Sequence, residues 1–368
     1  MRPTKAIIRL SNLGHNYREL RKRVAPAKVA AVIKADAYGH GAVEAAQTLA
    51  DLKTPPEYFA VAYAEEAKPL RKAGVKTPVL VFDLLSKDNL EEVVADNLEI
   101  TVADERHLRL LSRAKLERRV AVHVNVDTGM GRVGTPYREA VAFIRKVAAA
   151  RNVRLAGVYT HFATSDEKDK TFARLQTRRF KEIVDRLREE GVDYGVAHAA
   201  NSGGVLDLPE ATFDMVRLGI SLYGYYPSLE TSESVPLKPV MALESRVGSS
   251  RIYEKGETVS YGRLFMARRS TRIVSVPIGY ADGVNRNLTH RMKAIIKGRI
   301  VPHVGRVTMD RIMFDVGDLD VRAGDRVVLI GEAGGKRIDA WDWSRALETI
   351  PYEITCAISK RVPRVYRR

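Results

Sequence analysis

Residues 29–41 read Val-Ala-Ala-Val-Ile-Lys-Ala-Asp-Ala-Tyr-Gly-His-Gly, an apolar run that ends abruptly at a lysine. The segment Val29–Ile33 is apolar on both faces, which is typical of a parallel strand buried inside a protein. Lys34 ends this strand, and a turn that contains two glycines follows it. Because burying an unpaired ammonium group is costly, Lys34 either reaches solvent or takes part in chemistry.

Seven further runs of this kind follow in the first two-thirds of the chain. They cover Tyr58–Tyr63, Pro78–Phe82, Leu98–Val102, Val120–Val126, Arg154–Thr160, Gly195–Ala199 and Asp214–Leu218. Between them, amphipathic stretches such as Ala103–Lys115, Pro136–Ala149 and Asp169–Glu190 predict helices, with Pro136 in the first turn of its helix. Eight strand–helix units in about 220 residues predict a (β/α)8 TIM barrel over residues 1–235, and a doubly wound sheet is the competing arrangement.

The texture of the sequence changes at about Pro236, after which long helical periodicity stops. Strand-like runs replace it at Met241–Val247, Thr258–Tyr261, Ile273–Val276, Ala294–Ile296, Arg299–Val304, Ile312–Val316 and Arg326–Ile330. We therefore expect a mainly β domain over residues 236–368, joined to the barrel by the proline-rich segment Pro227–Pro239. The short run Ala6–Arg9 could add a strand to either domain.

The formal charge of +16 is the one unusual feature of the composition, and it raises the question of a nucleic-acid partner. Residues 1–235 hold 36 basic and 31 acidic residues, whereas residues 236–368 hold 25 and 14. The excess is scattered, apart from Arg268-Arg269 and the tail Arg364, Arg367 and Arg368. Because no basic tract is interleaved with aromatic residues, we expect no nucleic-acid partner.

The sequence also limits the cellular setting of the protein. A single cysteine, Cys356, excludes a disulfide framework and any cysteine-built metal site, and we expect it to be a buried bystander. No run approaches the roughly 18 apolar residues of a membrane span, and the first ten residues lack the apolar core of a signal peptide. We expect a cytoplasmic protein with no membrane partner and no metal.

Residues 129–134, Gly-Met-Gly-Arg-Val-Gly, match the dinucleotide-binding pattern G-x-G-x-x-G. The match follows the fifth strand of the series instead of the first, and residues 147–157 contain no acidic residue to hold a ribose. We therefore interpret the segment as a glycine-rich turn that brings Arg132 to the mouth of the barrel.

The position of Lys34 allows two interpretations. At the carboxyl end of a barrel strand its side chain would face the active-site end of the fold, where a lysine in a dry pocket can form a Schiff base. A strand-end lysine that simply reaches water is the alternative.

The segment Ala31–Gly41 resembles the pyridoxal-phosphate lysine motif of the alanine racemase family. The resemblance continues in order along the chain, at residues 126–132, 159–164, 200–202, 217–224, 259–262, 279–283 and 305–310. It implies that Lys34 holds pyridoxal 5'-phosphate as a Schiff base and acts as one acid/base. It also implies that the phosphate is held by Tyr38, Asn201, Ser202, Tyr352 and the backbone around Gly219 and Ile220.

The resemblance places Arg217 against the pyridine nitrogen of the cofactor. An arginine can only donate hydrogen bonds, so it would keep that nitrogen unprotonated and restrain side reactions such as transamination. Removing a proton from one face and returning one to the other calls for two bases. The family pattern gives Tyr261 as the second base, delivered from the partner subunit of a homodimer, with His161 and Arg217 linked to it through hydrogen bonds.

The resemblance also assigns the substrate contacts. Arg132 would orient the phenol and the substrate carboxylate, and the backbone N–H of Met309 would bind that carboxylate from the partner chain. The residues that would narrow the access corridor toward small amino acids such as alanine are Asp166, Tyr280, Arg286, Arg306, Asp310 and Tyr352. Asp282 and Asp310 could also be interpreted as a carboxylate pair.

The sequence departs from the family pattern at two positions. Asn125 stands where many relatives carry a carbamylated lysine, so we expect Arg132 to be braced by Asn125, by an anion such as chloride, or by water. Thr308 stands beside Met309 where some relatives have cysteine.

The leading hypothesis is therefore an enzyme, a pyridoxal-phosphate-dependent alanine racemase that supplies D-alanine for peptidoglycan. A broader racemase acting on serine or basic amino acids is a close alternative, and the corridor residues argue against the basic substrates. A non-catalytic pyridoxal-phosphate-binding regulator would lack the β domain and Tyr261. Related decarboxylases favour an acidic partner for the pyridine nitrogen, and Arg217 argues against them.

Overall fold

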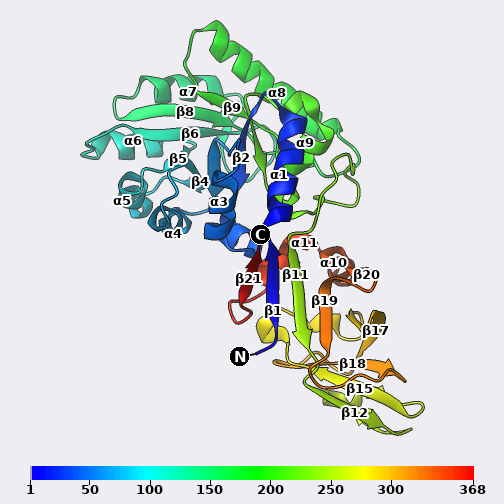
Figure 1. The fold of residues 1–368 in the computed structure, drawn as a ribbon. Coiled ribbons are helices and arrows are strands. Elements are labelled where there is room, and N and C mark those ends of the chain that lie inside the picture. The colour runs from blue at the N-terminus through cyan, green and yellow to red at the C-terminus, as the bar shows by residue number, and fades with distance from the viewer. Residues whose placement is uncertain (1) are drawn as a thin grey trace. The chain divides into compact units, whose positions relative to one another are not determined.

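Eight parallel strands close into a barrel in the computed structural model, which describes residues 2–368 (Figure 1). Around the barrel the strands follow the order β2 (Lys28–Val32), β3 (Tyr58–Val61), β4 (Val79–Leu84), β5 (Glu99–Val102), β6 (Val120–Asp127), β8 (Val153–Tyr159), β9 (Val196–His198) and β10 (Met215–Leu218). Pairing of β5 with β6 and of β10 with β2 closes the ring. The TIM barrel is confirmed, and a doubly wound sheet is excluded because such a sheet stays open.

Helices cover the outside of the barrel because their apolar faces have only the strands to pack against. They are α1 (Leu10–Val24), α3 (Ala42–Ala50), α4 (Lys68–Lys72), α5 (Lys87–Ala95), α6 (Glu105–Arg113), α7 (Ala140–Ala149), α8 (Thr171–Glu189) and α9 (Ser202–Asp207). The prediction for Pro136 is wrong. It lies in the two-residue strand β7 (Thr135–Pro136), which pairs with β6, and the helix begins four residues later.

A second unit, which we call the β unit, comprises residues 2–12, 38–40 and 239–368, and the remaining residues form the barrel unit. Its sheet has the order β12 (Ser249–Tyr253), β15 (Thr271–Val276), β18 (Ile312–Gly317), β17 (Arg299–Val304), β16 (Lys293–Ile296), β19 (Arg326–Ala333), β11 (Met241–Arg246), β1 (Lys5–Arg9) and β21 (Arg364–Arg367). The strand β20 (Lys336–Ile338) pairs with β19, and β13 (Thr258–Val259) with β14 (Phe265–Met266). The run that could have joined either domain is therefore β1 of this sheet, paired with β11 and β21.

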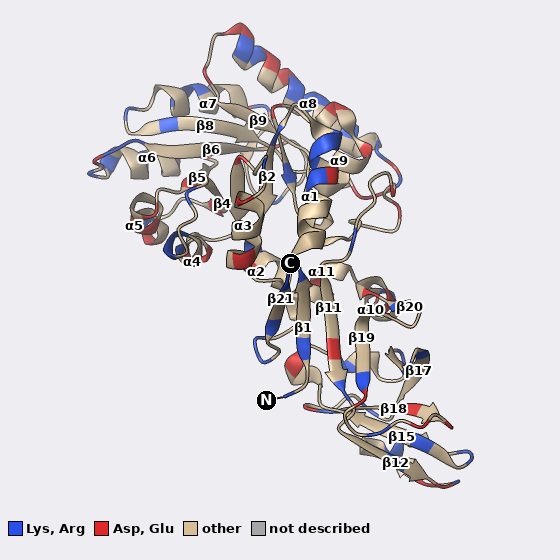
Figure 2. Cartoon of the chain, in the orientation of Figure 1, with Lys and Arg blue, Asp and Glu red and all other residues tan. Residues whose placement is uncertain are grey.

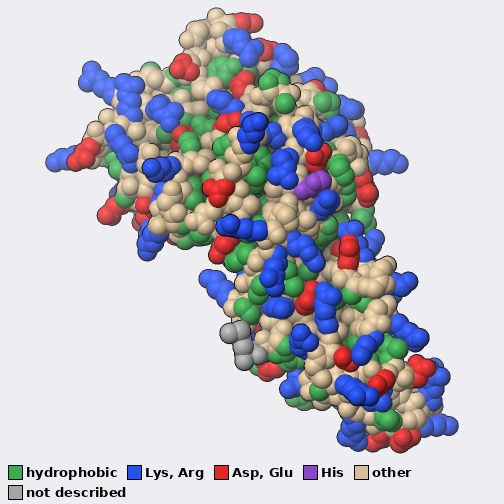
Figure 3. All heavy atoms as spheres, in the orientation of Figure 1, with side chains coloured by type: hydrophobic (Ala, Val, Ile, Leu, Met, Phe, Trp, Pro, Cys, Tyr) green, Lys and Arg blue, Asp and Glu red, His purple; other side chains and the backbone are tan. Residues whose placement is uncertain are grey.

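Two helices of the β unit have no counterpart among the predicted elements. They are α10 (Ala340–Leu347), which Asp339 caps by accepting from the N–H of Trp341, and α11 (Pro351–Ala357). The arginine-rich tail is also a strand instead of a basic arm, because Arg364 and Arg367 belong to β21. In Figure 2 basic residues are dispersed among acidic ones along the elements of each unit, and Figure 3 shows the same mixture on the face in view. No helix among residues 2–368 is long and apolar enough to cross a membrane.

Candidate active site

The candidate lysine opens a left-handed helical turn, α2 (Lys34–Gly39). Four successive residues other than glycine, Ala35 to Tyr38, have φ between 52° and 54°, a conformation that costs L-residues about 1–2 kcal/mol each. The turn is held at both ends: the N–H of Ala35 donates to Glu66 at 2.7 Å, and Asp36 accepts from the N–H of Ala42 at 2.8 Å. Such a turn projects the half-buried Lys34 from the carboxyl end of β2, with its Nζ 6.0 Å from the ring centroid of Phe82 on β4.

Arg217 on β10 is 3% exposed and donates five hydrogen bonds. Nη1 donates to Nδ1 and the carbonyl oxygen of His198, and Nη2 donates to Nδ1 of His161 at 3.2 Å and to the carbonyls of Thr160 and Ala199. Burial lowers the pKa of Arg217 to about 10, so the guanidinium stays charged at neutral pH. Within residues 2–368 its Nε has no hydrogen bond, which leaves one donor for a ring nitrogen.

His161 is surrounded by positive charge. Burial, together with the charges of Arg217, Arg132 and Lys34, holds the pKa of His161 well below its usual range, so the ring is neutral. Because Nη2 of Arg217 can only donate, Nδ1 of His161 must accept, and its proton is on Nε2. The ring therefore offers an N–H donor on the side away from Arg217.

Arg132 lies in the exposed glycine-rich turn after β6. Gly129, Gly131 and Gly134 all have positive φ, and a Cβ on Gly134 would lie 2.7 Å from the backbone nitrogen of Asp127. These glycines are thus required by the turn itself, which leads to β7 and not to a helix N-terminus facing a phosphate. The dinucleotide interpretation fails for that reason, and the charge of Arg132 is close enough to depress the pKa of His161.

A cradle of polar groups lies where β9 and β10 end. Oγ of Ser202 accepts from the N–H groups of Gly219 at 3.0 Å and Ser221 at 3.4 Å, so its own proton is left to donate. Oγ of Ser221 is buried without a hydrogen-bond partner, and the N–H of Ile220 has none within residues 2–368. Unused donors at this end of a barrel fit the oxygens of a phosphate group.

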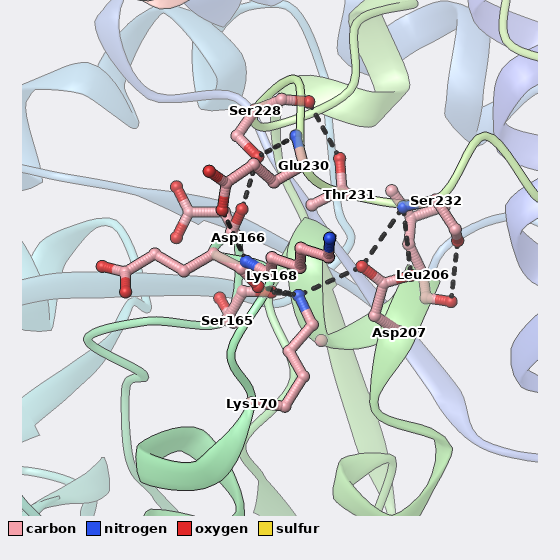
Figure 4. A network of polar contacts seen from close by, with 12 residues as sticks. Ser165, Asp166, Lys168, Lys170, Leu206, Asp207, Ser228, Glu230, Thr231 and Ser232 are labelled. Atoms are coloured by element: carbon pink, nitrogen blue, oxygen red, sulfur yellow. Dashed lines mark hydrogen bonds and ion pairs between the residues drawn. The ribbon is translucent and has the colours of Figure 1, made fainter.

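The loop before α8 is linked to residues 206–207 and 228–232 by hydrogen bonds and an ion pair (Figure 4). Ser165 donates to Oδ1 of Asn201, which also accepts from the N–H of Gly204 at 3.0 Å. Lys170 donates to the carbonyl of Ser165 at 2.9 Å and forms an ion pair with Asp207 at 3.1 Å, in which both side chains are mostly buried. The backbone oxygen of Asp166 accepts from Ser228 in the same network, which ties this corridor candidate to the segment after the barrel.

Tyr38 and Tyr352 are brought together within the β unit. Their ring centroids are 5.8 Å apart, and Tyr352 lies on α11. The close approach depends on Gly39, whose φ is +83° and where a Cβ would lie 2.2 Å from the carbonyl oxygen of Thr355. Gly39, the last residue of the left-handed turn, therefore packs directly against the backbone of α11.

Tyr261 and Met309 are exposed side chains of the β unit, 72% and 50% accessible. Tyr261 follows Ser260, which has φ of 70°, and precedes Gly262 with φ of 71°. The N–H of Met309 makes no hydrogen bond within residues 2–368, so it is available to a ligand.

Three of the predicted corridor residues of the β unit line two cavities. Arg286 and Arg306 line one of about 540 Å³, and Tyr280 and Arg286 line another of about 710 Å³. Arg361 forms ion pairs with Asp310 at 2.6 Å and Asp282 at 3.3 Å. A guanidinium shared by both carboxylates does not fit an acid/base pair.

The side chains of Asn125, Thr308 and Cys356 lie in three different environments. Asn125 on β6 is 8% exposed, and no hydrogen bond links its side chain to Arg132 within residues 2–368. Thr308 uses its hydroxyl to donate to the carbonyl of Arg311 at 2.7 Å. The prediction of a buried cysteine is wrong: Cys356 is exposed, because it lies on the outer face of the short helix α11.

Three buried polar residues that connect to Arg217 were not identified from the sequence. They are Glu99, His123 and His198, each inside a run interpreted only as an apolar strand. The polar residue itself could have pointed to this network, because a charged or imidazole side chain at a buried strand position needs a hydrogen-bond partner.

Both parts of the chain match models of one family. Residues 8–227 match the N-terminal domain of alanine racemase and residues 240–366 the C-terminal domain. The chain is 41% identical to "Alanine racemase 2" of Caldanaerobacter subterraneus subsp. tengcongensis, over all of this chain and 95% of that protein. It is also 41% identical to the alanine racemase of Carboxydothermus hydrogenoformans, over the full length of both chains.

A solved structure gives the same result. Alanine racemase of Clostridium difficile 630 in complex with cycloserine superposes with a TM-score of 0.92 at 36% identity, covering all of this chain and 96% of that one. The chain belongs to the alanine racemase family.

Proposed function

We propose that the protein is a pyridoxal-phosphate-dependent alanine racemase that interconverts L-alanine and D-alanine. The observation that carries this proposal is that Lys34 follows β2 while Arg217, on the neighbouring strand β10, donates to His161 and keeps an unused Nε. Unused donors around Ser202 and Ser221 supply a phosphate site at the same end of the barrel. A lysine, a ring-nitrogen donor and a phosphate cradle are the three features that this cofactor requires.

Pyridoxal phosphate, when bound, supplies the electron-withdrawing ring that makes the α-proton of an amino acid removable. The chain would hold it covalently through Nζ of Lys34. Asn201, Ser202, Gly219, Ile220, Tyr38 and Tyr352 are proposed to hold its phosphate. Arg217 can donate but never accept, so it keeps the ring nitrogen unprotonated.

The chain's own groups move the protons. Nζ of Lys34 takes or returns the α-proton on one face of the substrate, and Oη of Tyr261 does so on the other. A phenol has a reference pKa of about 10, so it needs a neighbour that stabilises its deprotonated form before it can act as a base. The neutral His161, whose Nδ1 accepts from Arg217, has only the N–H on Nε2 to offer, so it would donate a hydrogen bond to the phenolate oxygen.

We infer that the functional unit is a homodimer in which each β unit serves the partner's barrel. Supporting this, Tyr261 and Met309 are exposed in their own unit, and the N–H of Met309 is available to bind a substrate carboxylate. Arg132 would orient that carboxylate from the barrel side. The side chains of Asp166, Tyr280, Arg286, Arg306 and Asp310 would restrict access to small amino acids.

We propose that the D-alanine made in this reaction is used for peptidoglycan and that the enzyme works in the cytoplasm. Residue roles can be separated by comparing Lys34→Ala with Tyr261→Phe. Lys34→Ala should lose the visible absorbance that borohydride abolishes in the loaded protein. Tyr261→Phe should keep it and exchange the α-proton of D-alanine in D2O without racemising it, and wild-type racemisation by this variant would contradict the two-base scheme.

A further inference from the structure

A continuous row of hydrogen bonds runs from Arg217 to a buried glutamate, and we call it the imidazole row. Nη1 of Arg217 lies 3.0 Å from Nδ1 of His198, and Nε2 of His198 lies 3.0 Å from Nδ1 of His123. Nε2 of His123 lies 2.7 Å from Oε2 of Glu99. Both histidines are completely buried and Glu99 is 6% exposed, so the row is shielded from water.

Only one arrangement of protons satisfies the row. Arg217 can only donate, so Nδ1 of His198 accepts and its proton is on Nε2. Nδ1 of His123 must then accept from His198, which puts the proton of His123 on Nε2, facing Glu99. A protonated His123 or a protonated Glu99 would set two donors against each other at one of these contacts. The row therefore requires two neutral imidazoles and an ionised carboxylate.

The surroundings of Glu99 support that charge state. Arg154 donates to Oε1 of Glu99 at 2.8 Å, on the side away from His123. Although burial alone would raise it, the hydrogen bond from His123 and the charge of Arg154 hold the pKa of Glu99 below its usual range. Burial, together with the charge of Glu99, raises the pKa of Tyr58 to about 12, so this neighbouring phenol stays protonated.

The barrel wall is shaped to admit the row. β8 separates β6 from β9 in the sheet, so the rings of His123 and His198 meet across it. Gly157 of β8 makes this contact possible, because a Cβ there would lie 2.4 Å from Nδ1 of His123. The register between β6 and β8 shifts at Val122/His123, which is a bulge at the residue whose ring enters the row.

Arg217 needs such a row because it is a buried cation with no direct counter-charge. No carboxylate forms an ion pair with it in the part of the chain that the structure describes, and an unpaired buried charge is strongly unfavourable. The two imidazoles are aligned, and each accepts a hydrogen bond on the Arg217 side and donates one on the Glu99 side. The negative charge of Glu99 therefore polarises both rings, and their aligned dipoles stabilise the positive charge of the guanidinium.

We propose that Glu99 and His123 are positioning residues for the proposed racemase, which act through His198 to fix Arg217 as a charged donor with its Nε directed at the cofactor. The orientation of the row is a property of the chain alone. Its consequence for the reaction rests on the proposed function.

The first test is the protonation of the row in the protein without cofactor. In 15N-histidine-labelled protein at neutral pH, long-range 1H–15N correlation should show His123 and His198 as neutral rings with the proton on Nε2. Assignment comes from the spectra of His123→Gln and His198→Gln. A cationic ring, or a proton on Nδ1 in either, would overturn the proposal, whether or not the protein racemises alanine.

The second test removes the negative charge. In Glu99→Gln one of the two carboxylate oxygens becomes an NH2 group, which cannot accept. Either Arg154 or His123 therefore loses its acceptor. The Arg217 side-chain 15N signals should then shift or broaden, and the visible band of the loaded protein should move. We expect kcat for alanine to fall about tenfold, which corresponds to the loss of a hydrogen bond to a charged group, with a smaller change in KM.

Glu57→Gln is the matched control, because Glu57 is a glutamate that accepts hydrogen bonds from an arginine, Arg21, and from the N–H of Val29, but is not part of the row. It should leave the Arg217 signals, the visible band and kcat unchanged. Equal effects of Glu99→Gln and Glu57→Gln would overturn the proposal. A correct tautomer pattern in a protein that does not racemise alanine would instead refute the proposed function and leave the row intact.

Discussion

Replacing Gly157 by alanine tests the packing that admits the imidazole row. A Cβ at this position would lie 2.4 Å and 2.6 Å from Nδ1 and Cε1 of His123, and 2.8 Å from the carbonyl oxygen of Val196. None of these atoms can give way easily, since Val196 is held in β9 and His123 is hydrogen-bonded at both ring nitrogens. Overpacking a close-packed interior costs about 1–3 kcal/mol, and we expect the upper end of that range.

The measurement is the free energy of unfolding in urea, compared with that of a second glycine variant. Gly14 lies in α1, and a Cβ there would approach the end of the flexible Arg18 side chain at 3.2 Å and make an ordinary contact with Cδ2 of Leu52 at 3.7 Å. Gly14→Ala should therefore stabilise the protein by about 0.5–1 kcal/mol, as alanine does in a helix interior. If Gly157→Ala were as stable as wild type, the steric reasoning about the row would be refuted.

Three other predictions concern the β unit, the lysine turn and the loop at the phosphate cradle. Burial lowers the pKa of His303 to about 4, so between about pH 6.5 and pH 4 this histidine binds a proton in the unfolded chain but not in the folded one. The free energy of unfolding should therefore fall by about 3 kcal/mol from pH 6.5 to 4. Urea unfolding of His303→Asn should show a smaller fall over the same range. Gly39→Ala should weaken cofactor binding, measured by equilibrium dialysis, because its Cβ would strike the carbonyl of Thr355, and unchanged affinity would contradict the docking of the turn on α11. Lys170→Met should cost about 2 kcal/mol in urea unfolding by leaving Asp207 unpaired, and a neutral result would show that this ion pair does not brace the loop.

The barrel was predictable because its strands are buried on both faces and separated by amphipathic helices. Each predicted strand overlaps an observed one, with ends that differ by one or two residues. Pro136 was misplaced because a proline is tolerated in a short edge strand as well as in the first turn of a helix, and sequence pattern alone does not separate the two. Cys356 was misplaced because α11 is too short to show which of its faces is buried.

The candidate site was predictable where the resemblance supplied long motifs, as around Lys34, His161 and Arg217. The left-handed course of the lysine turn was not, because Ala35 to Tyr38 carry no residue type that favours positive φ. Only its tertiary contacts hold that conformation. The imidazole row was also missed, because its residues are scattered over β5, β6 and β9 and meet only when the barrel closes.

The most direct test of the proposed function follows the optical rotation of L-alanine, and separately of D-alanine, with the pyridoxal-phosphate-loaded protein in D2O. We predict that the rotation of both solutions decays to zero and that deuterium appears at Cα of both enantiomers. A yellow protein that leaves the rotation of both solutions unchanged would contradict the proposed racemase activity.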